Sequence, residues 1–220
     1  MTMTKISPQD IEQAWLAKSA SQAFRQAPTR SWWDAATEAR LLAEEIHAGQ
    51  ARAGTELPYF WHLAETAMIV GIFHATGMLS DSEFIIALEG AWLHDSMEDQ
   101  NYPKAKIANS FGSQQADVVD SLSKRESADE NFDAMADSLS RILLVGKIAA
   151  LVKAADRISN ISGPPPPNWR RKKVIAYGQQ GLAIAQALSP ALPEQARAAL
   201  EKVANIYLEQ ALVQAPLGHP

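Results

Sequence analysis

Hydrophobic residues recur at three- and four-residue spacing along most of this chain. The spacing is clear in two segments, Ala39, Leu42, Ala43 and Ile46, and Met68, Ile69, Ile72 and Phe73. Such spacing places apolar side chains on one face of an α-helix, whereas the alternation typical of strands is nearly absent. Ala, Leu, Gln and Glu are abundant and favour helix. The pattern predicts an all-α fold of roughly nine or ten helices.

Capping residues and helix breakers set the expected limits of these helices. Ser7 and Asp81 are the expected N-caps of two of them, and Gly49 is the expected end of a third. The segments expected to be helical are about 7–18, 31–49, 60–76, 81–95, 103–111, 114–122, 132–161, 168–188 and 193–213.

Three features interrupt the helical pattern. A break in segment 132–161 is expected near Ser140 or Gly146. The polar segment 124–133 is predicted to be partly mobile. The run Pro164–Pro167 should form a stiff loop, because a polyproline backbone has little entropy to lose.

Size and composition limit the classes of protein that fit. A chain of 220 residues with no internal repeat or linker suits one well-buried domain, so we expect a single domain over 1–220. The net charge of -5 argues against a nucleic-acid partner but leaves room for a basic pocket that binds a small anion. No cysteine is present, which excludes disulfides and thiolate metal sites. No apolar run approaches the length of a membrane span, so we expect no membrane partner and a cytoplasmic protein.

Four residues with metal-binding side chains follow apolar segments or aromatic residues. They are His62, His94, Asp95 and Asp156. The apolar runs 84–88 and 148–152 suggest that the side chains after them point inward, and a buried carboxylate without a partner is costly. A divalent cation is the natural partner, and imidazole with carboxylate suits manganese, iron or zinc.

Each of these residues also has a purely structural explanation. A single histidine on a helix is more often a surface or core residue than a ligand. Asp156 could form a surface ion pair with Arg157, which would be worth little. The metal hypothesis therefore depends on the conjunction of all four residues.

Two acids follow the His94-Asp95 pair at helical spacing. In one continuous helix Glu98 would stack on His94 and Asp99 on Asp95, about 6 Å along the axis. This arrangement would place a pair of acids one turn from the metal, where a water molecule and its base belong.

The remaining histidines are expected to lie outside the metal site. His47 should be structural and bond to the loop that carries Arg52. His74 and His219 are expected at the surface, without partners.

Seven short motifs occur in one order along the chain. They are His47-x-x-Gln50-x-Arg52, Thr55-x-x-Pro58-Tyr59-x-x-His62, His94-Asp95-x-x-Glu98-Asp99, Phe111-Gly112, Ser123-Lys124-Arg125, Lys153-x-x-Asp156-Arg157-x-x-Asn160 and the segment from Trp169 to Tyr177. Over residues 39–188 the chain thereby resembles the HD superfamily, and more narrowly the alarmone-hydrolase branch of the RelA/SpoT family. The Glu-Asp extension is the most specific part, since most HD phosphohydrolases lack it.

The resemblance implies a single-domain HD-type helical bundle, with terminal helices as extensions. It implies removal of the 3′-pyrophosphate from guanosine tetra- or pentaphosphate, with one divalent metal, usually manganese. The partner would be a small purine nucleotide, and homo-oligomer formation is left open. The implied roles are metal binding by His62, His94, Asp95 and Asp156, catalysis by Glu98 and Asp99, and substrate contact by Arg52, Lys124, Asn160, Lys173 and Tyr177.

The resemblance also suggests which role each residue has in the hydrolysis. Glu98 would orient or deprotonate the attacking water, and Asp99 would position the surrounding network. The cations Arg52, Lys124 and Lys173 would neutralise charge on the leaving pyrophosphate.

Departures from the family pattern keep alternatives open. Ala53 follows Arg52 where a second cation is common, Gln100 replaces a threonine, and Lys173 replaces an arginine. The adenine analogue (p)ppApp or the 2′-phosphate of NADPH is therefore an alternative substrate. Two further alternatives are a nucleotide phosphatase of the wider HD group and a degenerate module that binds a nucleotide and regulates a partner.

Overall fold

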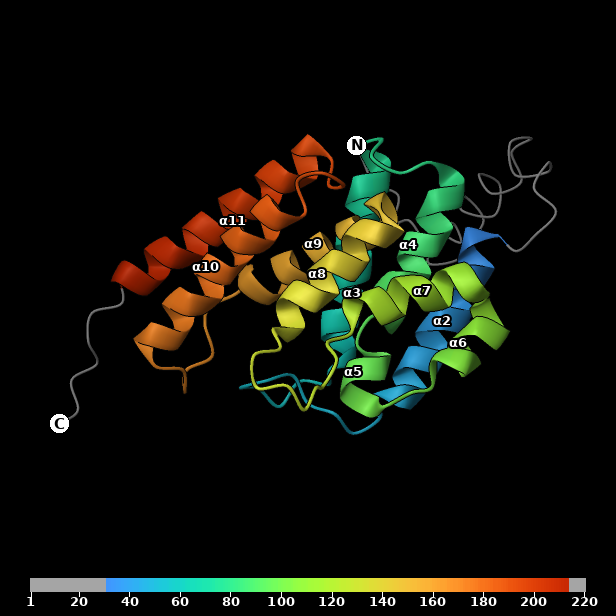
Figure 1. Cartoon of the computed structure of the whole chain (residues 1–220), viewed down its shortest axis with the longest axis horizontal. Helices are drawn as coiled ribbons and strands as arrows, with labels where there is room; N and C mark the ends of the chain where they lie inside the picture. Colours follow the sequence, from blue (N-terminus) through green and yellow to red (C-terminus); the bar gives the residue numbers. More distant parts are fainter. Residues whose placement is uncertain (1–30, 214–220) are drawn as a thin grey trace, which may run out of the picture.

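The computed structural model describes residues 31–213, and this part of the chain is helical apart from its turns and loops (Figure 1). The helices are α2 (Trp32–Ile46), α3 (Phe60–Ala75), α4 (Asp81–Leu93), α5 (Ser96–Gln100), α6 (Lys104–Phe111), α7 (Ser113–Leu122), α8 (Ala134–Val145), α9 (Lys147–Ile161), α10 (Arg171–Ala187) and α11 (Glu194–Val213). The β pairing within the described residues is one isolated bridge between Ala51 and Pro58. The prediction of an all-α fold is confirmed, while the helix expected over 7–18 lies outside the described residues.

Helix α9 lies at the centre of the fold. It packs against α3, α4, α7, α8, α10 and α11. Most of its residues are buried, including four alanines that let the neighbouring helices approach closely: Ala149, Ala150, Ala154 and Ala155. Gly90 of α4 serves the same end, because a Cβ there would lie 3.2 Å from Val118 and 3.4 Å from Val152. A polar side chain on α9 is therefore carried into the core.

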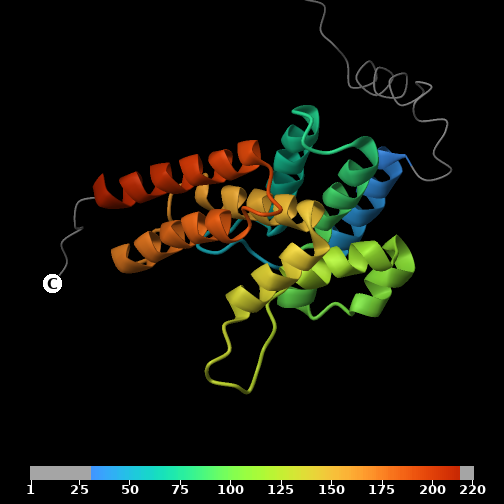
Figure 2. The same cartoon turned by 45° about the horizontal axis from the view of Figure 1, so that its top comes forward.

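Helices α10 and α11 form an antiparallel pair along one side of the molecule (Figures 1 and 2). Gly178 permits their close approach, since a Cβ at this position would lie 2.8 Å from the side chain of Leu208. The segment between α7 and α8 projects from the helices in Figure 2, and its predicted mobility stays a prediction.

The expected break in segment 132–161 is found at Gly146, between α8 and α9. Gly146 has a φ of 97°, a backbone conformation that favours glycine. Ser140 lies inside α8, where its hydroxyl donates to the carbonyl of Ala136.

The predicted N-cap of α4 was wrong by one residue. Ser80 caps the helix: its hydroxyl accepts from the backbone N–H of Glu83, and the Glu83 carboxylate accepts from the N–H of Ser80. This capping box needs the three-residue spacing that Ser80 and Glu83 have. Asp81 is instead the first helical residue and bonds to His74, 2.9 Å away.

His74 therefore has partners, contrary to the prediction. Besides the bond to Asp81, its ring stacks on Phe84 with centroids 4.2 Å apart. The reason is the short turn from α3 to α4, which brings the end of one helix beside the start of the next. His219 lies outside the described residues.

The single helix predicted through His94 and Asp95 was also wrong. Helix α4 ends at Leu93, and α5 begins at Ser96 after a turn at Asp95 with φ of -99° and ψ of 0°. The hydroxyl of Ser96 donates to the carbonyl of Leu93 at 2.6 Å, a bond that competes with the regular helical pattern. Beyond this turn, the backbone N–H of Asp99 still donates to the carbonyl of Asp95 at 2.9 Å, so Asp99 lies one helical turn from Asp95.

Candidate metal centre and substrate cavity

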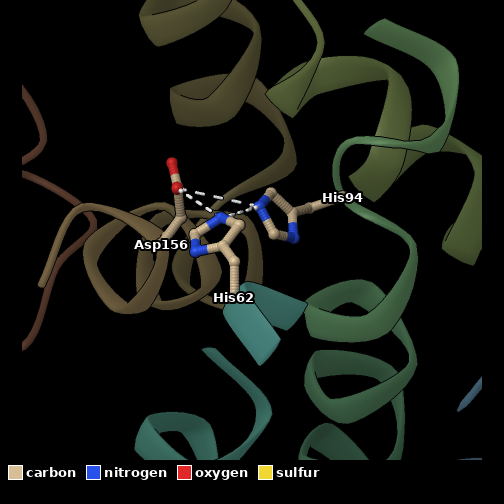
Figure 3. Close-up of side chains that lie close together, drawn as sticks. All are labelled: His62, His94 and Asp156. Atoms are coloured by element: carbon tan, nitrogen blue, oxygen red, sulfur yellow. Dashed lines mark hydrogen bonds and ion pairs between the residues drawn. The ribbon is translucent and has the colours of Figure 1, made fainter. Parts of the chain in front are cut away.

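Three helices bring the predicted metal-binding side chains to one place. His62 lies in the first turn of α3, His94 is the C-cap of α4, and Asp156 lies on α9. All three are buried, and Figure 3 shows their side chains pointing toward one another. Asp95 follows His94 and is partly exposed.

The ligand atoms converge at metal-binding distances. Nε2 of His62 lies 3.2 Å from Nε2 of His94, and Oδ1 of Asp156 lies 3.4 and 3.7 Å from these two nitrogens. Oδ2 of Asp95 lies 2.8 Å from Nε2 of His94 and 3.5 Å from that of His62. A cation with bonds of about 2.1 Å holds adjacent ligand atoms about 3.0 to 3.4 Å apart. The ligand atoms of His62, His94 and Asp156 lie within 4.8 Å of one another and can surround a single ion, and Asp95 lies beside the two imidazoles.

The outer nitrogen of each imidazole is engaged by the surrounding protein. Nδ1 of His94 donates to the carbonyl of Ala91 at 2.9 Å. Nδ1 of His62 lies 3.0 Å from the hydroxyl of Ser159, which itself donates to Glu65 at 2.7 Å. Both Nδ1 atoms therefore carry a proton that they donate to these partners, and Nε2 of each ring faces the cluster.

The charges in the cluster favour a cation. Burial lowers the pKa of His94, but Asp95 and Asp156 outweigh it and raise this pKa well above its usual value. Burial raises the pKa of Asp156, but Lys153, His62 and His94 outweigh it and hold this pKa well below its usual value. The two carboxylates thus favour positive charge at the imidazoles, a position that a divalent cation would occupy.

Asp156 is held by two neighbours on α9. Its Oδ2 accepts from the ammonium of Lys153 at 2.9 Å, and its Oδ1 accepts from the amide of Asn160 at 2.6 Å. Asn160, predicted as a substrate contact, thus orients a candidate ligand and also lines the adjoining cavity. Since Asp156 is buried and faces two histidines, the alternative of a surface ion pair with Arg157 is wrong.

The two predicted catalytic acids lie on α5 beside the cluster. Glu98 accepts from the ammonium of Lys124 at 2.5 Å and from its backbone N–H at 2.8 Å. Asp99 accepts from the amide of Gln50 at 2.7 Å, and burial and the charge of Asp95 raise its pKa. Both acids line the cavity, so they face the space that a substrate would fill.

A cavity of about 870 Å³ extends from the cluster to the proline loop. This volume is in the range of pockets that hold nucleotide-sized ligands. Of the predicted substrate contacts, those on its wall are Arg52, Lys124, Asn160 and Tyr177. Lys173 is not on the wall, and its ammonium lies 4.0 Å from the ring centroid of Trp169.

Arg52 is engaged within the protein. It forms a 2.6 Å ion pair with Glu65 and donates to the carbonyl of Ser159 at 3.1 Å. It therefore connects the loop before α3 to α9 at the edge of the cavity.

The expectation for His47 is confirmed. Its Nδ1 lies 2.6 Å from the side-chain oxygen of Gln50, in the loop that leads to Arg52, and its ring stacks on Tyr59 at 5.1 Å.

Sequence reasoning missed the role of Tyr59. Its hydroxyl donates to Oδ2 of Asp95, and burial followed by the charge of Asp95 raises its pKa, so the phenol stays protonated. The Pro58-Tyr59 motif marked this residue, but nothing in the sequence named its partner.

Comparison with known families agrees with this geometry. The sequence profile described as HD domain matches residues 39–163, which is more than half of the chain and includes all four converging residues. The chain belongs to the HD domain family. The resemblance predicted from the sequence is confirmed at this level.

Two curated relatives are guanosine-3′,5′-bis(diphosphate) 3′-pyrophosphohydrolases. The protein from Haemophilus influenzae is 32% identical over 143 residues, which cover 60% of this chain and 19% of the relative. The protein from Vibrio cholerae is 30% identical over 177 residues, which cover 76% of this chain and 22% of the relative. This chain therefore spans about a fifth of the length of these relatives.

A solved structure has the same fold. It is described as a metazoan ortholog of SpoT that hydrolyzes ppGpp and plays a role in starvation responses. The TM-score is 0.63 at 20% identity, and the match covers 84% of this chain and 97% of the other. The all-α HD-type fold is thus confirmed. Among the described residues, no helix is both long and apolar enough to cross a bilayer.

Proposed function

We propose that this chain is a metal-dependent hydrolase that removes the 3′-pyrophosphate from guanosine tetra- or pentaphosphate. The observation that carries the proposal is the convergence of His62, His94 and Asp156, with Asp95 beside both imidazoles, at one end of a nucleotide-sized cavity. The choice of guanosine follows the relatives, whose names give this reaction. Oligomeric state and a cytoplasmic location stay predictions from the sequence.

The proposed cofactor is one divalent cation, with manganese as the specific choice. His62 and His94 would supply Nε2, and Asp95 and Asp156 would each supply a carboxylate oxygen. When bound, such an ion acts as a Lewis acid toward the phosphoryl group and makes water a better nucleophile at neutral pH.

The acids on α5 handle the attacking water. Glu98 lies on the cavity wall and accepts the proton that the water loses. Asp99, held by Gln50, orients the hydrogen-bond network around that water.

The cations on the cavity wall would stabilise the charge of the leaving pyrophosphate. Lys124 bonds to Glu98 and therefore lies beside the proposed base. Its ammonium would stabilise the negative charge that develops on the departing pyrophosphate. Arg52 supports the wall through Glu65 and Ser159. Lys173 has no contact with the cavity and is assigned no role in this step.

Product analysis tests the proposal. Manganese-loaded protein is incubated with ppGpp, ppApp and NADPH in parallel, and the products are separated by chromatography. We expect GDP and pyrophosphate from ppGpp. Release of orthophosphate alone would indicate a phosphatase, and binding without turnover would indicate a regulatory module. A kcat/KM higher by about tenfold or more for ppApp or NADPH would overturn the guanosine assignment.

A further inference from the structure

Arg157 is a buried cation that borders the cavity without a carboxylate partner. It lies on α9 next to Asp156, lines the cavity wall and is 4% exposed. Its Nη2 donates to the side-chain oxygen of Gln180 on α10 at 2.9 Å, and its guanidinium carbon lies 4.3 Å from the ring centroid of Tyr177. Its Nε and Nη1 have no hydrogen-bond partner.

This environment leaves the guanidinium incompletely satisfied. Arginine stays charged in proteins and carries five N–H donors. A neutral amide oxygen and an aromatic face engage part of the group, but neither supplies negative charge. Buried charges are normally paired, and buried donors normally have acceptors. An anionic acceptor at this spot would meet both needs.

The other cations on the cavity wall differ from Arg157. Each of them contacts a carboxylate: Arg52 contacts Glu65 at 2.6 Å, Lys124 contacts Glu98 at 2.5 Å, and Lys153 contacts Asp156 at 2.9 Å. Within residues 31–213, no such pair involves Arg157, which is thus the cation of the wall whose charge is left for a ligand.

We propose that Arg157 binds a phosphate group of the substrate, against the wall formed by α9 and α10. The partnerless Nε and Nη1 would donate to phosphate oxygens, and Tyr177 against the guanidinium fixes the plane of the group. The identity of the substrate rests on the proposed function, whereas binding of a phosphate by Arg157 does not.

Two structural explanations compete with this assignment. Arg157 could serve to tie α9 to α10 through Gln180. An internal water could also satisfy its free donors together with the hydroxyl of Tyr207, which is 1% exposed and has no partner. Both explanations require Arg157 for stability and give it no part in phosphate binding.

Calorimetric titration of the metal-loaded protein with inorganic pyrophosphate and with GDP separates these cases. Arg157→Gln should weaken binding of at least one probe by about 10- to 100-fold, the range for a hydrogen bond to a charged group. Arg157→Lys keeps the positive charge but loses the planar guanidinium, so it should bind with intermediate affinity. This variant keeps the test valid if Arg157→Gln does not fold.

Two matched variants serve as controls. Gln180→Ala breaks the bond between α9 and α10 but keeps the cation, and Arg40→Gln removes the same charge from an exposed pair on α2. Both should bind the probes almost as the wild type does. Folding of every variant is checked by urea unfolding.

Unchanged affinity for both probes in a folded Arg157→Gln or Arg157→Lys variant would overturn the assignment. So would an equal loss in Gln180→Ala, or a wild type that binds neither probe. Turnover of ppGpp is measured on the same samples. Turnover with unchanged affinity overturns the role of Arg157 alone, whereas Arg157-dependent binding without turnover overturns the proposed function alone.

Discussion

The hydroxyl of Ser159 lies 3.0 Å from Nδ1 of His62 and connects this candidate ligand to Glu65, one turn further along the same helix. Because the hydroxyl donates to Glu65, it accepts a hydrogen bond from Nδ1–H of His62, and Nε2 of this ring then faces the cluster. Arg52 completes the chain by pairing with Glu65. The orientation of one imidazole therefore depends on residues from α3, α9 and the loop before α3.

Removing this hydroxyl should weaken metal binding. We expect Ser159→Ala to lower metal affinity by about 10- to 100-fold, since outer partners of metal-binding histidines have effects of this size. Titration of the metal-free protein with manganese measures the change. Ser140→Ala removes a hydroxyl that bonds only within α8, and its affinity should match the wild type. Equal affinities in all three proteins would contradict the role of Ser159.

Glu98→Gln should separate catalysis from metal binding. Both carboxylate oxygens of Glu98 bond to Lys124 rather than to the imidazoles or Asp156, so the variant should keep its metal. Loss of the general base should reduce turnover of ppGpp by about 10²- to 10⁴-fold. Metal content and initial rates are compared with Glu44→Gln, a change in an exposed pair on α2. Loss of metal, or a rate close to that of the wild type, would count against the assignment.

The pair of Glu83 and Lys147 should make stability depend on pH. Hydrogen bonds from Lys147 and from the backbone of Ser80 lower the pKa of Glu83 from 4.5 to about 2. A lowered pKa stabilises the fold above pH 4.5, and this contribution is lost as the pH falls toward about 2. Glu83 and Lys147 are both partly exposed, so the effect at neutral pH should be about 1 kcal/mol or less.

Urea unfolding of the wild type and Glu83→Gln tests this dependence. The free energy difference between the two should be largest near neutral pH and should shrink as the pH falls below 4.5. A difference that is constant over this range, or that grows toward acid, would show that the ion pair is not its cause.

Gly54 allows the loop before α3 to contact the proline loop at the cavity. Its φ is 76°, and a Cβ there would lie 2.8 Å from Cβ of Pro166. Gly49 has a φ of 80° but open space around it. In Gly54→Ala and in Gly49→Ala the free energy of unfolding should fall by about 1 to 2 kcal/mol, because alanine disfavours a left-handed backbone.

The clash with Pro166 should lower the free energy of unfolding further in Gly54→Ala, but not in Gly49→Ala. Because both loops line the cavity, this variant should also raise the KM for ppGpp, whereas Gly49→Ala should leave it unchanged. Urea unfolding and steady-state kinetics measure the two effects. Equal stability and equal KM in the two variants would mean that the contact between the loops is unimportant.

The sequence predicted the helical fold and the buried positions of His94 and Asp156 because both depend on local patterns. Apolar runs before the polar residues marked buried helices, and a buried carboxylate required a partner. The end of α4 at Leu93 was not predicted, because no glycine or proline marks it. At this end the hydroxyl of Ser96 donates to the carbonyl of Leu93.

Long-range partners escaped prediction for a different reason. Ser159 and Glu65 are far apart in sequence, and each has an ordinary surface-type side chain. For Arg157 the sequence indicates only a pairing with its neighbour Asp156, because it does not show that α10 lies beside this part of α9. Their true environments follow from the packing of α9 against α3 and α10.

We propose that His62, His94, Asp95 and Asp156 hold the one metal on which hydrolysis depends, and Asp95→Ala tests this most directly. Metal content per chain and pyrophosphate release from ppGpp are measured on the same preparations of wild type, Asp95→Ala and the surface control Asp117→Ala. We expect near-stoichiometric metal and pyrophosphate release in the wild type and the control, and loss of both in a folded Asp95→Ala. Equal metal content in all three proteins would contradict the claim.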